Sequence, residues 1–229
     1  MCGIYVAVSR HGFCPVNAHL KSLLQQRGPD SFLEHFLEVP IGNVPGSKVY
    51  ISIASSVLAL RGDVVVPQPI LSSGAESFLC WNGEAWKFKE KEITGNDASA
   101  VFQLLTLGGS DSHNQVIKGV EAIVGPFAMS FFNSRNQNLY FGRDYLGRRS
   151  LLTAKSQAGD VIISSVPDLS VSDAWEEVEA DGVYYIDLQM QVNGATNFAV
   201  GKIPYVTAGS TQITSLSDYI VLLSVRGSE

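Results

Sequence analysis

The sequence contains few of the residues that would build a disulfide framework or a structural metal site. Its three cysteines, Cys2, Cys14 and Cys80, are irregularly spaced, and neither they nor the four histidines form a CxxC or HxxxH pattern. This spacing argues against a disulfide scaffold and against structural zinc. We therefore expect no metal, no cofactor and a reducing, intracellular environment.

Long apolar runs and clusters of positive charge are also absent. No segment approaches the roughly 18 apolar residues that a membrane-spanning helix needs. The apolar stretch 4–8 has no basic segment before it, so we expect no secretory signal. The 16 basic residues are scattered among 22 acidic ones, giving a net charge of −6, which argues against a nucleic-acid surface. We predict a cytoplasmic protein with neither a membrane nor a nucleic-acid partner.

What the chain does have is enough apolar sequence for a large core, with 45% hydrophobic residues in a total of 229. Helical spacing of apolar residues predicts helices over 17–28, 96–109 and 114–125. Asn17 can cap the start of the first helix and Gly28 can end it, while Asn96 or Asp97 starts the second.

Compact β-branched and aromatic segments predict strands over 2–9, 48–60, 77–81, 126–132, 138–143, 150–154, 161–165 and 182–188. Short connections favour hairpins and antiparallel pairing, hence an α+β domain of stacked layers. Residues 64–77, with two prolines, are expected to be a loop. We assign one domain to 1–189. Residues 190–229 have little periodicity and are expected to be a linker or arm, with an amphipathic helix over 215–229.

Position 2 places a cysteine directly before glycine and an apolar run. If the initiator methionine is removed, Cys2 carries both a thiol and a free α-amine. The thiol has an ordinary pKa of about 8.5, and the amine, with a pKa of about 7.7–8.0, could accept its proton. From position alone, a small apolar residue at the start of a strand is the simpler interpretation.

Two further segments contain groups suited to acyl transfer. In WNGE at 81–84, Asn82 offers a side-chain N–H₂ and Gly83 a closely approachable backbone N–H, as an oxyanion requires. The same Asn-Gly pair is also typical of a hairpin turn.

Charged residues elsewhere also allow both a structural and a functional interpretation. Asp97 could cap a helix or hold an ammonium group. Arg61 could bind a carboxylate through its planar fork or be a solvated surface arginine. The segment GRDYLGRRSL at 142–151 is expected to form an ion-paired turn.

The order of these segments resembles that of a known family. MCGI, RGPD at 27–30, WNGE, ND at 96–97, GPFAMSFF at 125–132 and FGRDYLGRRSLL at 141–152 follow one another as in class II glutamine amidotransferase domains of the asparagine synthetase family. The resemblance covers residues 1–190. It implies a four-layer αββα N-terminal-nucleophile hydrolase sandwich of two mainly antiparallel sheets.

The resemblance also implies roles for single residues. Cys2 would attack the side-chain amide of L-glutamine, forming a thioester and releasing ammonia before water liberates glutamate. Asn82 and Gly83 would form the oxyanion hole, Glu84 would line the glutamine site with Gly83, and Asp97 would hold the α-ammonium group. RGPD would shape the loop beside the nucleophile. In the family, the ammonia passes to a synthetase domain.

The sequence departs from the family at two places. Leu58 stands where the family has an arginine for the glutamine α-carboxylate, at a cost of about 1.5–3 kcal/mol for a lost charge-assisted contact. Arg61 lies three residues further on. It would face away from Leu58 if 57–61 were a strand, although a strand end could redirect it.

The second departure is the missing pyrophosphate loop of the synthetase half, so these residues alone are not expected to make asparagine. A binding or regulatory module, or a hydrolase of another amide, are the alternatives.

Overall fold

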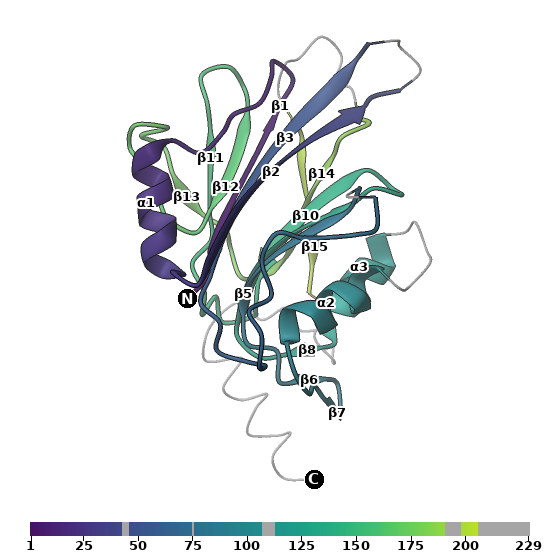
Figure 1. The fold of residues 1–229 in the computed structure, drawn as a ribbon. Coiled ribbons are helices and arrows are strands. Elements are labelled where there is room, and N and C mark those ends of the chain that lie inside the picture. The colour runs from purple at the N-terminus through teal and green to yellow at the C-terminus, as the bar shows by residue number, and fades with distance from the viewer. Residues whose placement is uncertain (43–45, 75, 107–112, 191–197, 206–229) are drawn as a thin grey trace.

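Two antiparallel six-stranded sheets packed face to face form the centre of a computed structural model of the protein (Figure 1). The structure describes residues 1–42, 46–74, 76–106, 113–190 and 198–205. Sheet A consists of β1 (Gly3–Ser9), β2 (Ser31–Pro40), β3 (Lys48–Val57), β11 (Leu152–Lys155), β12 (Val161–Ser164) and β13 (Glu176–Glu177). Sheet B consists of β4 (Ile70–Leu71), β5 (Phe78–Gly83), β9 (Phe127–Asn133), β10 (Asn138–Arg143), β14 (Gly182–Asp187) and β15 (Val200–Pro204).

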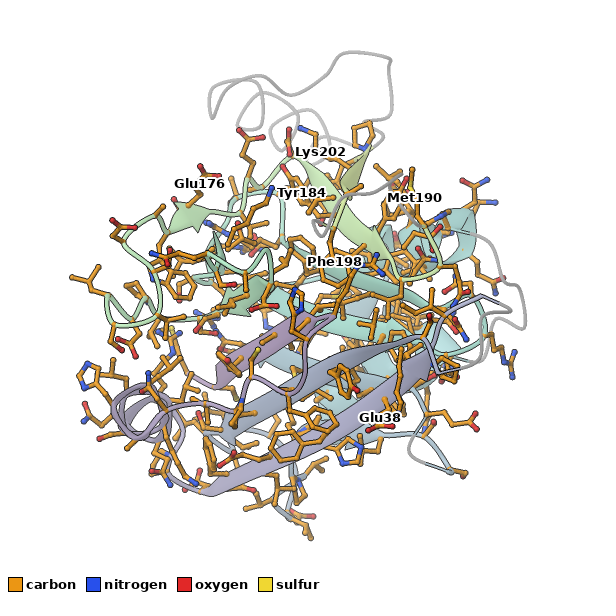
Figure 2. All side chains as sticks on the ribbon, turned by 90° about the horizontal axis from the view of Figure 1, so that it is seen from above. Glu38, Glu176, Tyr184, Met190, Phe198 and Lys202 are labelled. Carbon is orange, nitrogen blue, oxygen red and sulfur yellow. The ribbon has the colours of Figure 1, made fainter. Side chains whose placement is uncertain are left out.

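The strand order places β1 and β5 within their sheets. Sheet A runs β13-β11-β12-β1-β3-β2 and sheet B runs β15-β14-β10-β9-β5-β4. Because successive side chains of a strand point to opposite faces, β1 sends Ile4 and Val6 between the sheets and Tyr5 toward the outer helix. Likewise, Cys80 of β5 lies between the sheets. The main core is therefore the space between the sheets, where Phe198 also lies (Figure 2).

Helices cover the outer face of each sheet. Helix α1 (Ala18–Arg27) packs on sheet A, whereas α2 (Asp97–Thr106) and α3 (His113–Glu121) lie over sheet B (Figure 1). Asn17 caps α1, because its side-chain oxygen accepts the Leu20 N–H at 2.8 Å. The order helix, sheet, sheet, helix confirms the predicted α+β sandwich. Within the described residues, no helix combines the length and the apolar character that crossing a bilayer requires.

Several elements differ from the sequence prediction. Strand β2 was not expected; it is the edge strand of sheet A, and its half-exposed side chains give no clean alternation. A small sheet of β6 (Lys87–Phe88), β7 (Lys91–Glu92) and β8 (Ile123–Val124) was also missed. The predicted loop over 64–77 contains β4, which pairs with the first residues of β5. These elements are short or lie at edges, where tertiary pairing outweighs local pattern.

Part of the segment expected to be an arm is a strand. Val200–Pro204 form β15, which pairs with β14 at the edge of sheet B. On its outer side, Lys202 donates to Asp181 at 2.6 Å and lies near the Tyr184 ring (Figure 2). A partner strand, not the segment's own weak periodicity, orders these residues. The rest of 190–229, including the helix predicted over 215–229, lies largely outside the described residues.

Candidate active site

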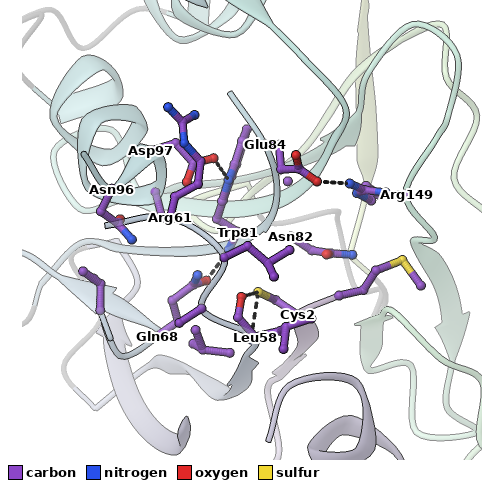
Figure 3. Close-up of a pocket in the computed structure, with 17 residues that line it drawn as sticks. Cys2, Leu58, Arg61, Gln68, Trp81, Asn82, Glu84, Asn96, Asp97 and Arg149 are labelled. Atoms are coloured by element: carbon purple, nitrogen blue, oxygen red, sulfur yellow. Dashed lines mark hydrogen bonds and ion pairs between the residues drawn. The ribbon is translucent and has the colours of Figure 1, made fainter. Parts of the chain in front are cut away.

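The fold brings the predicted site residues to one pocket (Figure 3). By strand alternation, residue 2 shares the inner face of β1 with Ile4, and Asn82 shares the inner face of β5 with Cys80. The thiol from sheet A and the amide from sheet B therefore face the same space. The residues predicted from sequence that line it are Cys2, Arg61, Asn82, Gly83, Glu84 and Asp97.

Cys2 is half-buried, and its sulfur lies against the backbone of Leu58. The Leu58 N–H donates to Cys2 Sγ at 3.5 Å, and the thiol lies 3.8 Å from the Leu58 carbonyl oxygen. Burial raises the pKa of the Cys2 thiol, while the Leu58 N–H works in the opposite direction. The α-amine of Met1 donates to the Arg27 carbonyl oxygen at 3.1 Å, and burial lowers the pKa of this amine.

Close approaches at two glycines set the surroundings of Cys2. A Cβ on Gly3 would lie 2.5 Å from Ser56 Oγ, and one on Gly28 would lie 2.5 Å from the Val57 carbonyl carbon. In the RGPD segment, the Asp30 side chain accepts the Ala59 N–H at 2.7 Å. Glycine at these positions lets α1 and the RGPD loop pack directly on the end of β3, beside Cys2.

Asn82 is 2% exposed, and its Nδ2 makes no hydrogen bond within the described residues. Seven buried side-chain polar atoms among the described residues have no hydrogen-bond partner. Asn82 Nδ2 is the one among them that belongs to a residue lining the pocket. The predicted turn at Asn82-Gly83 is wrong, because β5 continues through Gly83. A Cβ on Gly83 would lie 2.7 Å from Phe127 Cβ, so glycine serves close packing here and not a hairpin.

Asp97 holds the segment on both sides of Asn82. Its Oδ2 accepts the Trp81 indole N–H at 3.1 Å and the Ala85 backbone N–H at 2.8 Å. Capping of α2 is done by Asn96, whose side-chain oxygen accepts the Ser99 N–H at 3.0 Å. The helix start was predicted at either residue; the structure assigns the cap to Asn96 and directs the Asp97 carboxylate toward residues 81–85.

Arg61 is not the solvated surface arginine that the sequence allowed. Its guanidinium donates to the carbonyl oxygens of Ala85 and Ile93, the latter at 2.9 Å. Strand β3 ends at Val57 instead of near residue 60, so strand alternation does not separate Leu58 from Arg61. Both line the pocket.

Sequence reasoning missed two polar residues that line the pocket. Arg149 pairs with Glu84, with Nη2 and Oε1 2.8 Å apart. Gln68 is 3% exposed, and its Oε1 accepts the Trp81 backbone N–H at 2.6 Å. Arg149 belongs to the segment 142–151, whose ion-paired character is confirmed by the Arg148–Asp144 pair. The sequence around Arg149 does not indicate that this side chain lines the pocket.

The fold is one seen in solved structures. It superposes on glutamine phosphoribosylpyrophosphate (PRPP) amidotransferase from B. subtilis, complexed with ADP and GMP, with a TM-score of 0.58 and 14% sequence identity. The alignment covers 90% of this chain and 50% of that one. The chain therefore shares the sandwich fold of that amidotransferase, the N-terminal-nucleophile hydrolase fold.

Sequence comparison adds particular relatives. The chain is 32% identical over 195 residues to asparagine synthetase domain-containing protein 1 of Bos taurus, and 31% identical over 198 residues to the Homo sapiens protein of that name. No protein-family model matches. The chain is thus a homologue of asparagine synthetase domain-containing protein 1. The matches cover 82% and 84% of this chain but only 29% of the length of each relative.

Proposed function

We propose that this chain is a glutamine-hydrolysing amidotransferase domain that releases ammonia from the side-chain amide of L-glutamine. The observation that carries the proposal is the buried, unpaired Asn82 Nδ2 in the pocket that also contains the Cys2 thiol. A buried donor without a partner lowers stability. An oxyanion formed on an attacked carbonyl would supply the missing acceptor.

In this proposal, removal of Met1 frees the α-amine of Cys2. The amine takes the thiol proton, and the sulfur attacks the amide carbon of glutamine, so that the carbonyl oxygen becomes an oxyanion. When this intermediate collapses, the carbon–nitrogen bond breaks, the ammonium group of Cys2 returns the proton, and ammonia leaves. Water then attacks the thioester and releases glutamate, restoring the thiol.

The oxyanion would receive two donors from β5. One is Asn82 Nδ2. The other is the Gly83 N–H, because backbone groups alternate sides along a strand: Glu84 N–H points toward the β9 side, to the Pro126 carbonyl oxygen at 2.9 Å. The neighbouring Gly83 N–H therefore points away from β9.

The ends of the substrate would meet charged side chains. In this proposal, the Asp97 carboxylate receives the α-ammonium group. Both hydrogen bonds that hold residues 81–85 use Oδ2, which leaves Oδ1 for the substrate. Arg61 has five N–H donors, and two backbone carbonyls engage only part of them. It is our choice for the α-carboxylate, with Glu84 lining the site.

One observation favours a second reading, a catalytically weak or inactive module that retained the fold. Leu58 occupies the wall of the pocket beside Cys2, and the Arg61 guanidinium is already engaged. Titration calorimetry with glutamine separates the two readings. Micromolar to millimolar binding supports the enzyme, and absence of binding supports the inactive module.

The test of the mechanism is Cys2→Ala. We expect this variant to release no glutamate above background, whereas Cys14→Ala, which alters a cysteine outside the pocket, should retain the activity. Intact mass before and after treatment with a glutamine-mimicking diazoketone should show a chain without Met1 and a single label, lost in Cys2→Ala. Glutamate release that persists in Cys2→Ala would refute the proposal.

The wider context is part of the same proposal. We place the reaction in the cytoplasm, where three free cysteines stay reduced. The released ammonia would serve an amidation like that of asparagine synthetase, performed by a synthetase domain. The chain spans 29% of the length of the two curated relatives reported above.

A further inference from the structure

Residue Gln68 lies on the wall of the pocket and contacts the strand that carries Asn82. Its side chain is 3% exposed, and Oε1 accepts the backbone N–H of Trp81 at 2.6 Å (Figure 3). No other hydrogen bond of this side chain is found among the described residues. The side-chain oxygen of Gln68 thus accepts its hydrogen bond from the residue directly before Asn82.

Strand pairing explains why this contact exists. Strand β4 is only two residues long and pairs Ile70 with Leu79 and Leu71 with Phe78. Continuing this antiparallel register by two residues places Gln68 opposite Trp81. Pro67 and Pro69 flank Gln68, and proline is disfavoured inside a sheet. The Gln68 side chain therefore supplies the hydrogen bond that a longer β4 would have supplied.

Trp81 has contacts through its backbone, its indole N–H and its ring. Its backbone pairs with Met129 of β9 on one edge and meets Gln68 on the other. Its indole N–H is bound by Asp97, and its ring stacks on Phe127 with centroids 5.2 Å apart.

Asn82 depends on this neighbour because its Nδ2 has no partner of its own. A side chain without that hydrogen bond takes its direction from its backbone and its packing. Small displacements of oxyanion donors reduce catalysis strongly. The contact at Trp81 thus controls where the Asn82 amide points.

We propose that Gln68 is a positioning residue that fixes β5 at Trp81 and thereby aims the Asn82 amide at the oxyanion. The kinetic part rests on the proposed glutamine hydrolysis; the structural part does not. Only the Oε1 acceptor is required. Gln68→Glu keeps an acceptor at the same reach and Gln68→Met, of similar size, removes it.

The kinetic test is a double-mutant cycle. Gln68→Met should lower kcat for glutamine hydrolysis about tenfold, the effect of losing one hydrogen bond, with KM within about threefold, and Gln68→Glu should restore most of kcat. In an Asn82→Ala background, Gln68→Met should change kcat less than about twofold, because the donor it aims is gone. An equal loss of kcat in both backgrounds would overturn the proposal.

Amide hydrogen exchange keeps this test independent of glutamine hydrolysis. The Trp81 amide should exchange about tenfold faster in Gln68→Met than in the wild type and in Gln68→Glu. If the wild type releases no glutamate, the proposed function fails and exchange alone decides the role of Gln68. If the exchange rate of the Trp81 amide is the same in Gln68→Met as in the wild type, the positioning role of Gln68 is refuted. Should Gln68→Met not fold, Gln68→Asn, too short to reach Trp81, replaces it with the same expectations.

Discussion

The side chains of Asp144 and Asn82 are both polar and both buried, at 2% exposure each, yet their hydrogen bonding differs. Both oxygens of Asp144 are used: Oδ1 accepts from the Leu146 N–H and from Arg148 Nε, and Oδ2 from the Phe127 and Arg148 N–H groups. In the pocket, the Asn82 Nδ2 has no partner.

The difference separates a stabilising network from a candidate reactive site. Buried polar groups in folded proteins are nearly always hydrogen-bonded, since an unpaired one costs about 1–3 kcal/mol. The Asp144 carboxylate obeys this rule and joins β9 to the loop after β10. Asn82 departs from it in a pocket that also contains the Cys2 thiol, as the proposed oxyanion hole would require.

The strongest way to break the comparison is to remove the unpaired donor. We expect Asn82→Ala to lower kcat for glutamine hydrolysis by roughly 10²–10³. The free energy of unfolding should not fall, because no hydrogen bond of Nδ2 is lost and a buried donor without a partner is removed. Steady-state kinetics and urea denaturation measure the two quantities.

A matched control for Asn82→Ala exists on the neighbouring strand. Ser130 of β9 is fully buried with an unpaired Oγ but does not line the pocket. Ser130→Ala should leave kcat unchanged. If Asn82→Ala behaves like Ser130→Ala in kinetics, the unpaired amide has no part in catalysis.

Asp144→Asn tests the other region. The new amide group cannot accept the bonds that one carboxylate oxygen accepts now, and it cannot pair with the Arg148 charge. We expect a loss of about 2–4 kcal/mol in the free energy of unfolding, measured by urea denaturation. The exposed Asp173→Asn is the control and should shift stability by less than about 0.5 kcal/mol. If Asp144→Asn and the wild type have equal free energies of unfolding, the hydrogen bonds of the Asp144 carboxylate do not stabilise the fold.

The smallest effect concerns the acidity of the Cys2 thiol. Because burial raises its pKa, less thiolate forms at a given pH, and iodoacetamide should label Cys2 of the form that retains Met1 at a higher midpoint pH than the urea-unfolded chain. In the form without Met1, the adjacent amine should bring this midpoint down. Peptide mass mapping follows both, with the fully buried Cys80 as an unreactive reference. A folded-state midpoint at or below the unfolded one contradicts this account.

Local chemistry identified much of the site in advance. Asn17 was predicted as a cap because its side chain can satisfy a helix N–H, and it does so. Cys2, Asn82 and Asp97 were singled out by residue type and by the resemblance in motif order, and the structure brings all three to one pocket. Such features depend on a few neighbouring residues, which a sequence displays directly.

The features that the sequence did not predict depend on contacts between distant segments. The sequence determined the alternation that sends Ile4 and Cys80 inward, the helix start at Asn17 and the identity of the nucleophile candidate. Only the tertiary structure decided that β15 joins sheet B, that Arg149 reaches Glu84 and that Gln68 completes the edge of β5. The physical reason is that periodicity and capping are set within a few residues, whereas partners 13 to 65 residues apart meet only when the two sheets are assembled.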